Sequence, residues 1–72
     1  MEDELRKNLA LNIRLERVKK RLTQEKLAEL SNISPKHITK IENEGVMPSV
    51  YLVYKIALAL NVTIDQLLQK VD

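Results

Sequence analysis

The 72-residue chain contains no cysteine, tryptophan or phenylalanine, and it has only one glycine and two prolines. Without cysteine, neither a disulfide nor a thiolate zinc site can reinforce the core, and the composition fits a reducing compartment. A chain this short buries only about 60% of the surface that it exposes when unfolded. We therefore expect a single domain covering residues 1–72.

Long apolar runs are also missing. No segment approaches the roughly 20 apolar residues of a membrane helix, and the first residues lack the apolar part of a signal peptide. We expect a cytoplasmic protein that does not bind membranes. One histidine and one glycine provide no metal cluster, no nucleophile–base pair and no phosphate-binding glycine loop. We therefore expect no metal, cofactor, small-molecule ligand or enzymatic activity.

The formal net charge of +2 says little by itself, but the basic residues are unevenly distributed. They occur at Arg14, Arg17, Lys19, Lys20 and Arg21, and again at Lys26, Lys36 and Lys40. A basic face on a nearly neutral protein suits contact with phosphates. A solvated helix face is the alternative interpretation.

The apolar residues recur at helical spacing and show no sustained alternation, which predicts an all-α protein without strands. The expected helices are 4–21, 23–30, 35–43 and 49–60, and a last one capped by Thr63 that buries Ile64, Leu67 and Leu68. The first carries two apolar stripes, Leu5/Leu9/Ile13 and Leu11/Leu15/Val18. One should pack on the next two helices, and the other should meet the last helix or a partner chain.

The second and third helices are separated by the short segment 31–34. Helices joined by such a turn cross steeply and form a helix-turn-helix, whose second helix reads the DNA major groove. Ala28 permits close approach of the helices, and Asn32 tolerates the left-handed conformation that a turn needs. Ser34 can cap the third helix, with Pro35 at its first position. Agreement among these positions favours this motif over an ordinary helical hairpin.

Several motifs occur together along the chain: T-Q-x-x-L-A from residue 23, I-S at 33, I-x-x-I-E-N at 38, P-S at 48 and A-x-x-L-x-V-x-x-D-x-L-L at 57. Over about residues 13–68, this combination resembles the Cro/repressor-type (XRE-like) helix-turn-helix family. The resemblance implies a compact five-helix repressor-like domain that binds double-stranded DNA. It also implies a homodimeric transcriptional regulator, a repressor acting on a palindromic operator.

The resemblance also implies contacts to the DNA backbone. Gln24 matches a glutamine that bonds a phosphate, and Asn43 matches a backbone-contacting asparagine. Thr23 is a further phosphate candidate, although helix capping alone would explain it. Arg17 and Glu42 resemble a pair that joins the first helix to the third and brings Arg17 near a phosphate.

The groove-facing side of the third helix follows from helical geometry, which places Lys36, Thr39, Lys40 and Asn43 opposite the apolar Ile38 and Ile41. Lys36 and Lys40 are the best base-reading candidates because lysine donates to guanine O6 and N7. Thr39 and, at the edge of this face, His37 complete the candidate set. The alternative is that both lysines contact only phosphates.

Three positions depart from the family pattern. Glu44 stands where glycine usually ends the third helix, and Gly45 follows one place later. Val46 and Met47 are apolar where basic residues are common, and Pro35 replaces a residue that often reads a base. We therefore expect an altered exit from the third helix and fewer side chains in contact with DNA.

A dimer seam is expected in the fourth and fifth helices, at Val50, Tyr51, Leu52 and Tyr54. These tyrosines could equally be ordinary, partly buried surface residues. A different function also remains open, because a protein-interaction module can keep this fold without binding DNA. The apolar Val46 and Met47 and the second stripe of the first helix are compatible with such a module.

Overall fold

The computed structural model describes residues 2–71, and this part of the chain contains five helices and no strand. The helices are α1 (Glu2–Lys19), α2 (Gln24–Ser31), α3 (Pro35–Glu42), α4 (Val50–Leu60) and α5 (Ile64–Leu68). The predicted all-α, five-helix architecture is confirmed. The main difference in bounds is that α1 begins and ends two residues earlier than the expected 4–21.

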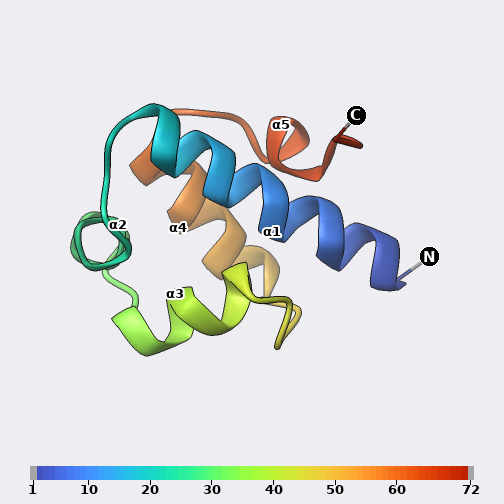
Figure 1. The fold of residues 1–72 in the computed structure, drawn as a ribbon, viewed down its shortest axis with the longest axis horizontal. Coiled ribbons are helices and arrows are strands. Elements are labelled where there is room, and N and C mark those ends of the chain that lie inside the picture. The colour runs from blue at the N-terminus through green and yellow to red at the C-terminus, as the bar shows by residue number, and fades with distance from the viewer. Residues whose placement is uncertain (1, 72) are drawn as a thin grey trace.

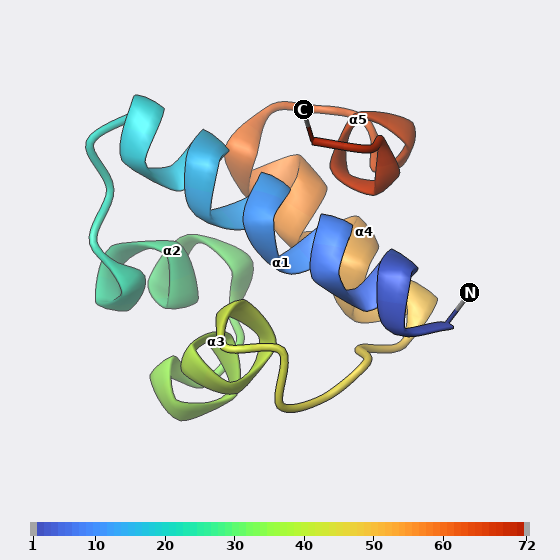
Figure 2. The same cartoon turned by 45° about the vertical axis from the view of Figure 1, so that its right-hand side comes forward.

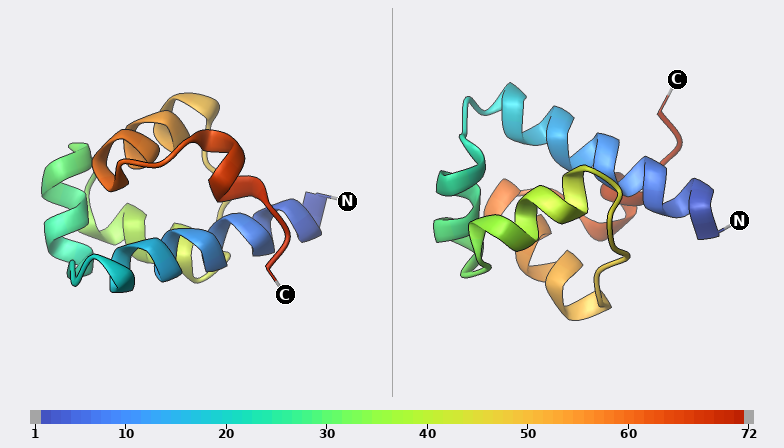
Figure 3. Two further views of the ribbon diagram at one scale, coloured as in Figure 1. Left: turned by 90° about the horizontal axis from the view of Figure 1, so that it is seen from above. Right: turned by 60° about the horizontal axis from the view of Figure 1, so that its bottom comes forward.

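Helix α1 runs along the molecule and contacts α3, α4 and α5, whereas α2 packs on α3 and α4 (Figures 1 and 3). Helix α3 forms one edge of the molecule, and α5 lies toward the opposite edge (Figure 1). The core consists of Leu9, Ile13, Leu27, Ala28, Ile33, Ile38, Ile41, Val53, Ile56, Ala57, Leu60 and Leu67. The two helices of the helix-turn-helix therefore rest on a platform built by α1 and α4.

Two residues expected in apolar contacts lie at the surface instead. Leu68 is 36% exposed and Leu5 is 45% exposed. Helix α5 has only five residues, so Ile64 and Leu67 occupy its inward face and Leu68 falls beside it. Leu5 lies in the first turns of α1, which extend past the other helices in Figure 1 and lie at the opposite end of the molecule from α2 in Figure 2.

The second apolar stripe of α1 is not covered by the described residues. Leu11, Leu15 and Val18 are 36%, 52% and 58% exposed. The contact that we expected between this stripe and the last helix is made instead by Asn12, whose amide donates to the carbonyls of Leu67 and Gln69 at 2.8 and 2.7 Å. The stripe therefore faces solvent.

Four helices begin with hydroxyl caps, as the sequence predicts. The caps are Thr23, Ser34, Ser49 and Thr63, and each accepts a hydrogen bond from the backbone N–H three residues later. Such a cap stabilises a helix by about 1 kcal/mol. Pro35 occupies the first turn of α3, where its missing N–H leaves no bond unmade.

Helices α1 to α4 end in left-handed residues, none of them glycine: Arg21, Asn32, Glu44 and Asn61. The predictions for Asn32 and Asn61 are confirmed. After α3, the N–H of Gly45 donates to the Lys40 carbonyl at 2.7 Å and that of Glu44 to Ile41 at 3.1 Å, the bonding pattern of a Schellman motif. Glu44 thus adopts the conformation that glycine usually provides.

Gly45 has a different role, because its own backbone is not left-handed. A Cβ atom at this position would lie 3.2 Å from the Lys40 carbonyl oxygen, so glycine allows the chain to turn back closely against α3. The displaced glycine therefore shapes the loop after α3, whereas the helix itself ends in the common left-handed motif.

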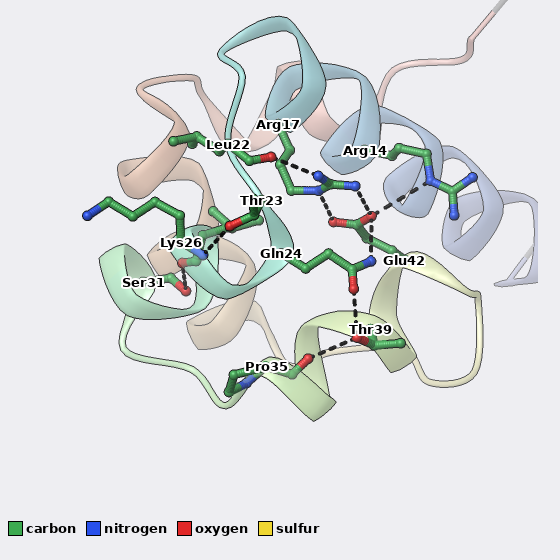
Figure 4. A network of polar contacts seen from close by, with 11 residues as sticks. Arg14, Arg17, Leu22, Thr23, Gln24, Lys26, Ser31, Pro35, Thr39 and Glu42 are labelled. Atoms are coloured by element: carbon green, nitrogen blue, oxygen red, sulfur yellow. Dashed lines mark hydrogen bonds and ion pairs between the residues drawn. The ribbon is translucent and has the colours of Figure 1, made fainter.

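The carboxylate of Glu42 joins α3 to α1, and its side chain is fully buried. Arg17 donates from Nε at 2.8 Å and from Nη2 at 3.1 Å to its two oxygens (Figure 4). The third nitrogen of Arg17, Nη1, donates to the Leu22 carbonyl at 2.8 Å. The pair implied by the resemblance is thus present, and it fixes α3 against the end of α1.

We expect Glu44→Gly to raise the free energy of unfolding by roughly 0.5–1 kcal/mol. A side chain in the left-handed region costs about 1–2 kcal/mol, and the greater freedom of glycine in the unfolded chain offsets part of that gain. Glu44→Ala keeps the Cβ atom and should give no such increase. Urea unfolding followed by circular dichroism compares the three proteins, and equal midpoints for Gly and Ala would contradict the strain.

We expect Glu42→Gln to lower the free energy of unfolding by about 3 kcal/mol, because it leaves the Arg17 guanidinium buried without its countercharge. Replacing both partners in Arg17→Met/Glu42→Leu should destabilise less than the sum of the two single changes. The same urea titrations compare Glu42→Gln, Arg17→Met, Glu42→Leu and the double variant with the unchanged protein. Additive effects would show that the two side chains do not stabilise each other.

Candidate nucleic-acid interface

The outer face of α3 carries the side chains expected to read bases. Lys36, Lys40 and Asn43 are exposed, whereas His37 and Thr39 are half-buried at the two sides of this face. Ile38 and Ile41 are buried on the opposite side. Because α3 forms an edge of the molecule in Figure 1 and faces the viewer in Figure 3 (right), the two exposed lysines project outward from the body.

The two lysines on this face also keep their charge unpaired. Among the described residues, ion pairs engage Lys19 and Lys20 with Glu16, and Lys26 with Glu29. None is formed by Lys36 or Lys40 within 4.0 Å. Their ammonium groups are therefore available to acceptors outside the protein.

Near the end of α1, the carboxylate of Glu16 reduces the net positive charge of the basic cluster. The hydrogen bond from Lys20, at 2.9 Å, lowers the pKa of the Glu16 carboxyl below its usual value, and the charges of Lys20 and Lys19 act in the same direction against the effect of burial. Glu16 therefore remains ionised near neutral pH. Part of the positive charge expected to face phosphates is neutralised within α1 itself.

Gln24 and Thr39, which the sequence assigns to a phosphate and to bases, contact each other. The Thr39 hydroxyl donates to Gln24 Oε1 at 2.8 Å, and Gln24 Nε2 donates to Glu42 Oε1 at 3.2 Å (Figure 4). The Thr39 hydroxyl also lies 3.1 Å from the Pro35 carbonyl. The amide of Gln24 thus bridges the start of α2 to α3 and retains a second N–H for an outside acceptor.

The remaining phosphate candidates differ in their freedom to donate. Thr23 Oγ1 accepts the N-cap bond from Lys26 at 2.9 Å, which leaves its hydroxyl proton exposed. Asn43 is exposed at the end of α3. Arg17 is different, because its side chain is only 14% exposed and all three of its nitrogens donate within the protein.

Two basic residues near this surface make contacts that the sequence does not indicate individually: Arg14 stands there only as a member of the basic cluster, and Lys55 is not among the candidates. Arg14 lies one turn before Arg17, is 51% exposed, and places its Nε 3.7 Å from Glu42. Lys55 on α4 donates to the Asn32 carbonyl in the turn at 3.1 Å and lies 5.2 Å from the centre of the Tyr51 ring. The spacing of Arg14 from Arg17 could have indicated the first, but the second joins distant segments and has no local signal.

Residues 2–71 contain neither a candidate metal site nor a candidate membrane span. No three histidine, cysteine or acidic side chains gather there in a way that could hold a metal ion. None of the helices there combines the length and apolarity needed to cross a bilayer.

Comparison with solved structures gives close matches over most of the chain. A hypothetical transcription factor, NHTF from Neisseria, is 34% identical, with a TM-score of 0.90 over 97% of this chain and 80% of that one. The restriction-modification controller protein C.AhdI from Aeromonas hydrophila is 27% identical, with a TM-score of 0.83 over 86% and 94%. The clp gene regulator ClgR from Corynebacterium glutamicum is 30% identical, with a TM-score of 0.84 over 89% and 68%.

No curated protein sequence matches the chain. The family model HTH_3, described as helix-turn-helix, matches residues 13–67, the same span on which the resemblance rests. The match includes α2, α3 and the turn between them. The chain therefore belongs to the HTH_3 family of XRE-type helix-turn-helix proteins, which are DNA-binding transcription regulators.

Proposed function

We propose that residues 1–72 act as one sequence-specific DNA-binding domain that forms a homodimer and represses transcription from a palindromic operator. The observation that carries this proposal is the outer face of α3, at the edge of the molecule, where Lys36 and Lys40 are exposed and form no ion pair with any residue that the structure describes. An exposed helix with such a face fits the major groove, whose guanine edges present two acceptors to lysine. A bound dimer would repress by occluding the promoter.

The flanking residues of α3 have graded roles in this proposal. His37 and Thr39 border the two lysines and are secondary base-reading candidates. Asn43, Thr23 and the second N–H of Gln24 face the phosphates on either side. Arg17 acts mainly by orienting α3 through Glu42, and the more exposed Arg14 supplies the charge near the backbone.

The dimer is assigned to the outer face of α4. Val50, Tyr51, Tyr54 and Leu58 are 78%, 67%, 50% and 61% exposed, and Lys55 is the only charged residue in this helix. Leu52 was expected in the seam, but it is partly buried against the core and supports this face from within. A two-fold dimer predicts an operator whose half-sites lie about one helical turn, roughly 34 Å, apart.

A protein-interaction module is the second candidate function. The observation in its favour is the exposed stripe Leu11/Leu15/Val18 on α1. Selection of bound fragments from random duplex DNA, followed by a salt titration, distinguishes the two functions. Regulation predicts an enriched palindrome whose affinity falls steeply with salt as phosphate counterions are released. If the protein binds no duplex even at low salt, the interaction module is the better account of its function.

Lys40→Ala should weaken binding to the selected operator by about 1–3 kcal/mol for each half-site and relax base preference at one position. The reason is that this ammonium donates to a base edge rather than to the backbone. Gel-shift titrations on operators varied at each position measure the preference. An unchanged preference would remove Lys40 from the base-reading set.

Gln24→Ala tests a contact with the DNA backbone in the same way that Lys40→Ala tests a contact with a base. Loss of a phosphate contact should weaken binding about equally on all of these duplexes, and the salt dependence should stay unchanged because Gln24 carries no charge. Because Gln24 also contacts Thr39 and Glu42, its unfolding midpoint must be measured alongside. A change confined to one base position would instead assign Gln24 to sequence readout.

Tyr54→Glu should convert the dimer to a monomer, because it places a carboxylate in the apolar seam of α4. Tyr54 is half-exposed, so the fold should survive. Sedimentation velocity at micromolar concentrations gives the assembly state, and Leu15→Glu on the exposed stripe of α1 is the control. Dissociation by the control, or a Tyr54→Glu protein that remains dimeric, would move the interface away from α4.

A further inference from the structure

A hollow of about 290 Å³ lies beside the lysine-bearing face of α3, between that helix and the loop that follows it. It is lined by Ser34, Lys36, His37, Lys40 and Val46. Val46 is the single aliphatic side chain among these five. The hollow therefore has one side chain without a polar group, next to the residues that would face base edges.

The position of Val46 is fixed by the backbone around it. The Gly45 N–H donates to the Lys40 carbonyl at 2.7 Å, and the missing side chain of Gly45 allows that close approach. This turn places the next residue, Val46, beside Lys40. Val46 is half-buried and packs against the hydrophobic core on its inner side. Its remaining surface is thus a rigid part of the hollow.

Of the groups that bases present in the major groove, only the C5-methyl of thymine is apolar. A lysine ammonium is hydrated and gains nothing from contact with a methyl group, whereas contact with the apolar Val46 would remove that methyl from water. We propose that this hollow binds the 5-methyl group of a thymine adjacent to a guanine contacted by Lys40. The inference rests on the proposed DNA-binding function and extends it to the base next to the lysine contact.

The size of the effect follows from the burial of a single methyl group. Removing it should weaken binding about fourfold in each half-site. Deoxyuridine is the matched probe, because it differs from thymidine only by that methyl and keeps the same hydrogen-bonding edge. The methyl contribution is then the ratio of two affinities measured with one protein.

The experiment uses the operator obtained by selection, with each thymine of one half-site replaced in turn by deoxyuridine. The wild-type protein should lose about fourfold in affinity at one thymine, the neighbour of the guanine whose preference relaxes in Lys40→Ala. Val46→Ala should bind the thymine duplex more weakly and show a ratio near one at that position. Met47→Ala, the neighbouring change in the same loop, should keep the wild-type ratio.

Each outcome separates this inference from the function on which it rests. Failure to select any duplex would overturn the proposed function itself. A selected operator on which no deoxyuridine weakens the wild-type protein would overturn the methyl site alone, as would a fourfold loss that persists in Val46→Ala. Because each ratio is internal to one protein, partial unfolding of a variant changes both affinities together and leaves the ratio intact.

Discussion

The orientation of α3 depends on one buried carboxylate. Glu42 accepts hydrogen bonds from Arg17 on α1 and from Gln24 on α2, so three helices meet at this group (Figure 4). An eight-residue helix has little stability of its own in water. Ile38 and Ile41 anchor its apolar side, but apolar packing tolerates some rotation. The directional bonds of Glu42 remove that freedom and thereby set the direction in which Lys36 and Lys40 point.

The same network divides the polar residues of the site into two groups. Arg17 and Thr39 donate within the protein, and recruiting them to DNA would leave Glu42 or Gln24 with a broken bond. Lys36, Lys40 and Asn43 are exposed on the outer face and can approach a duplex without rearranging the core. A half-buried Gln24 links the groups, because one N–H serves Glu42 and the other remains available. Arg17 and Thr39, which the sequence assigns to contacts with DNA, therefore hold the site in shape within the protein.

Local signals predicted most of this fold, and long-range contacts account for what they missed. Ser34 and Pro35 predict the start of α3, and Asn32 and Asn61 predict left-handed turns. Each of these residues affects only the backbone within a few positions of itself, so the sequence alone is enough. The left-handed conformation of Glu44 could not be predicted, because glutamate rarely adopts it. It accompanies two hydrogen bonds, from the Gly45 N–H to the Lys40 carbonyl and from the Glu44 N–H to the Ile41 carbonyl. The bond of Gln24 with Thr39, 15 residues away, depends on how α2 and α3 cross. The contact of Lys55 with Asn32 depends on the packing of α4, which no local pattern encodes.

Two apolar faces remain exposed, and their charged surroundings differ. The outer face of α4 carries one charged residue of its own, Lys55, which donates to Asn32 and lies over Tyr51. Asp65 borders the same face beside Tyr54 and Leu58. These two charges are of opposite sign, so the surface around this face is close to neutral. The stripe Leu11/Leu15/Val18 on α1 is flanked in helical projection by the exposed Lys7, Arg14 and Lys19, and the exposed Glu4 lies on the same side. Lys19 is paired with Glu16, so Lys7 and Arg14 leave this surface more positive than negative. For the dimer proposed above, electrostatics therefore favours the outer face of α4 over the stripe of α1.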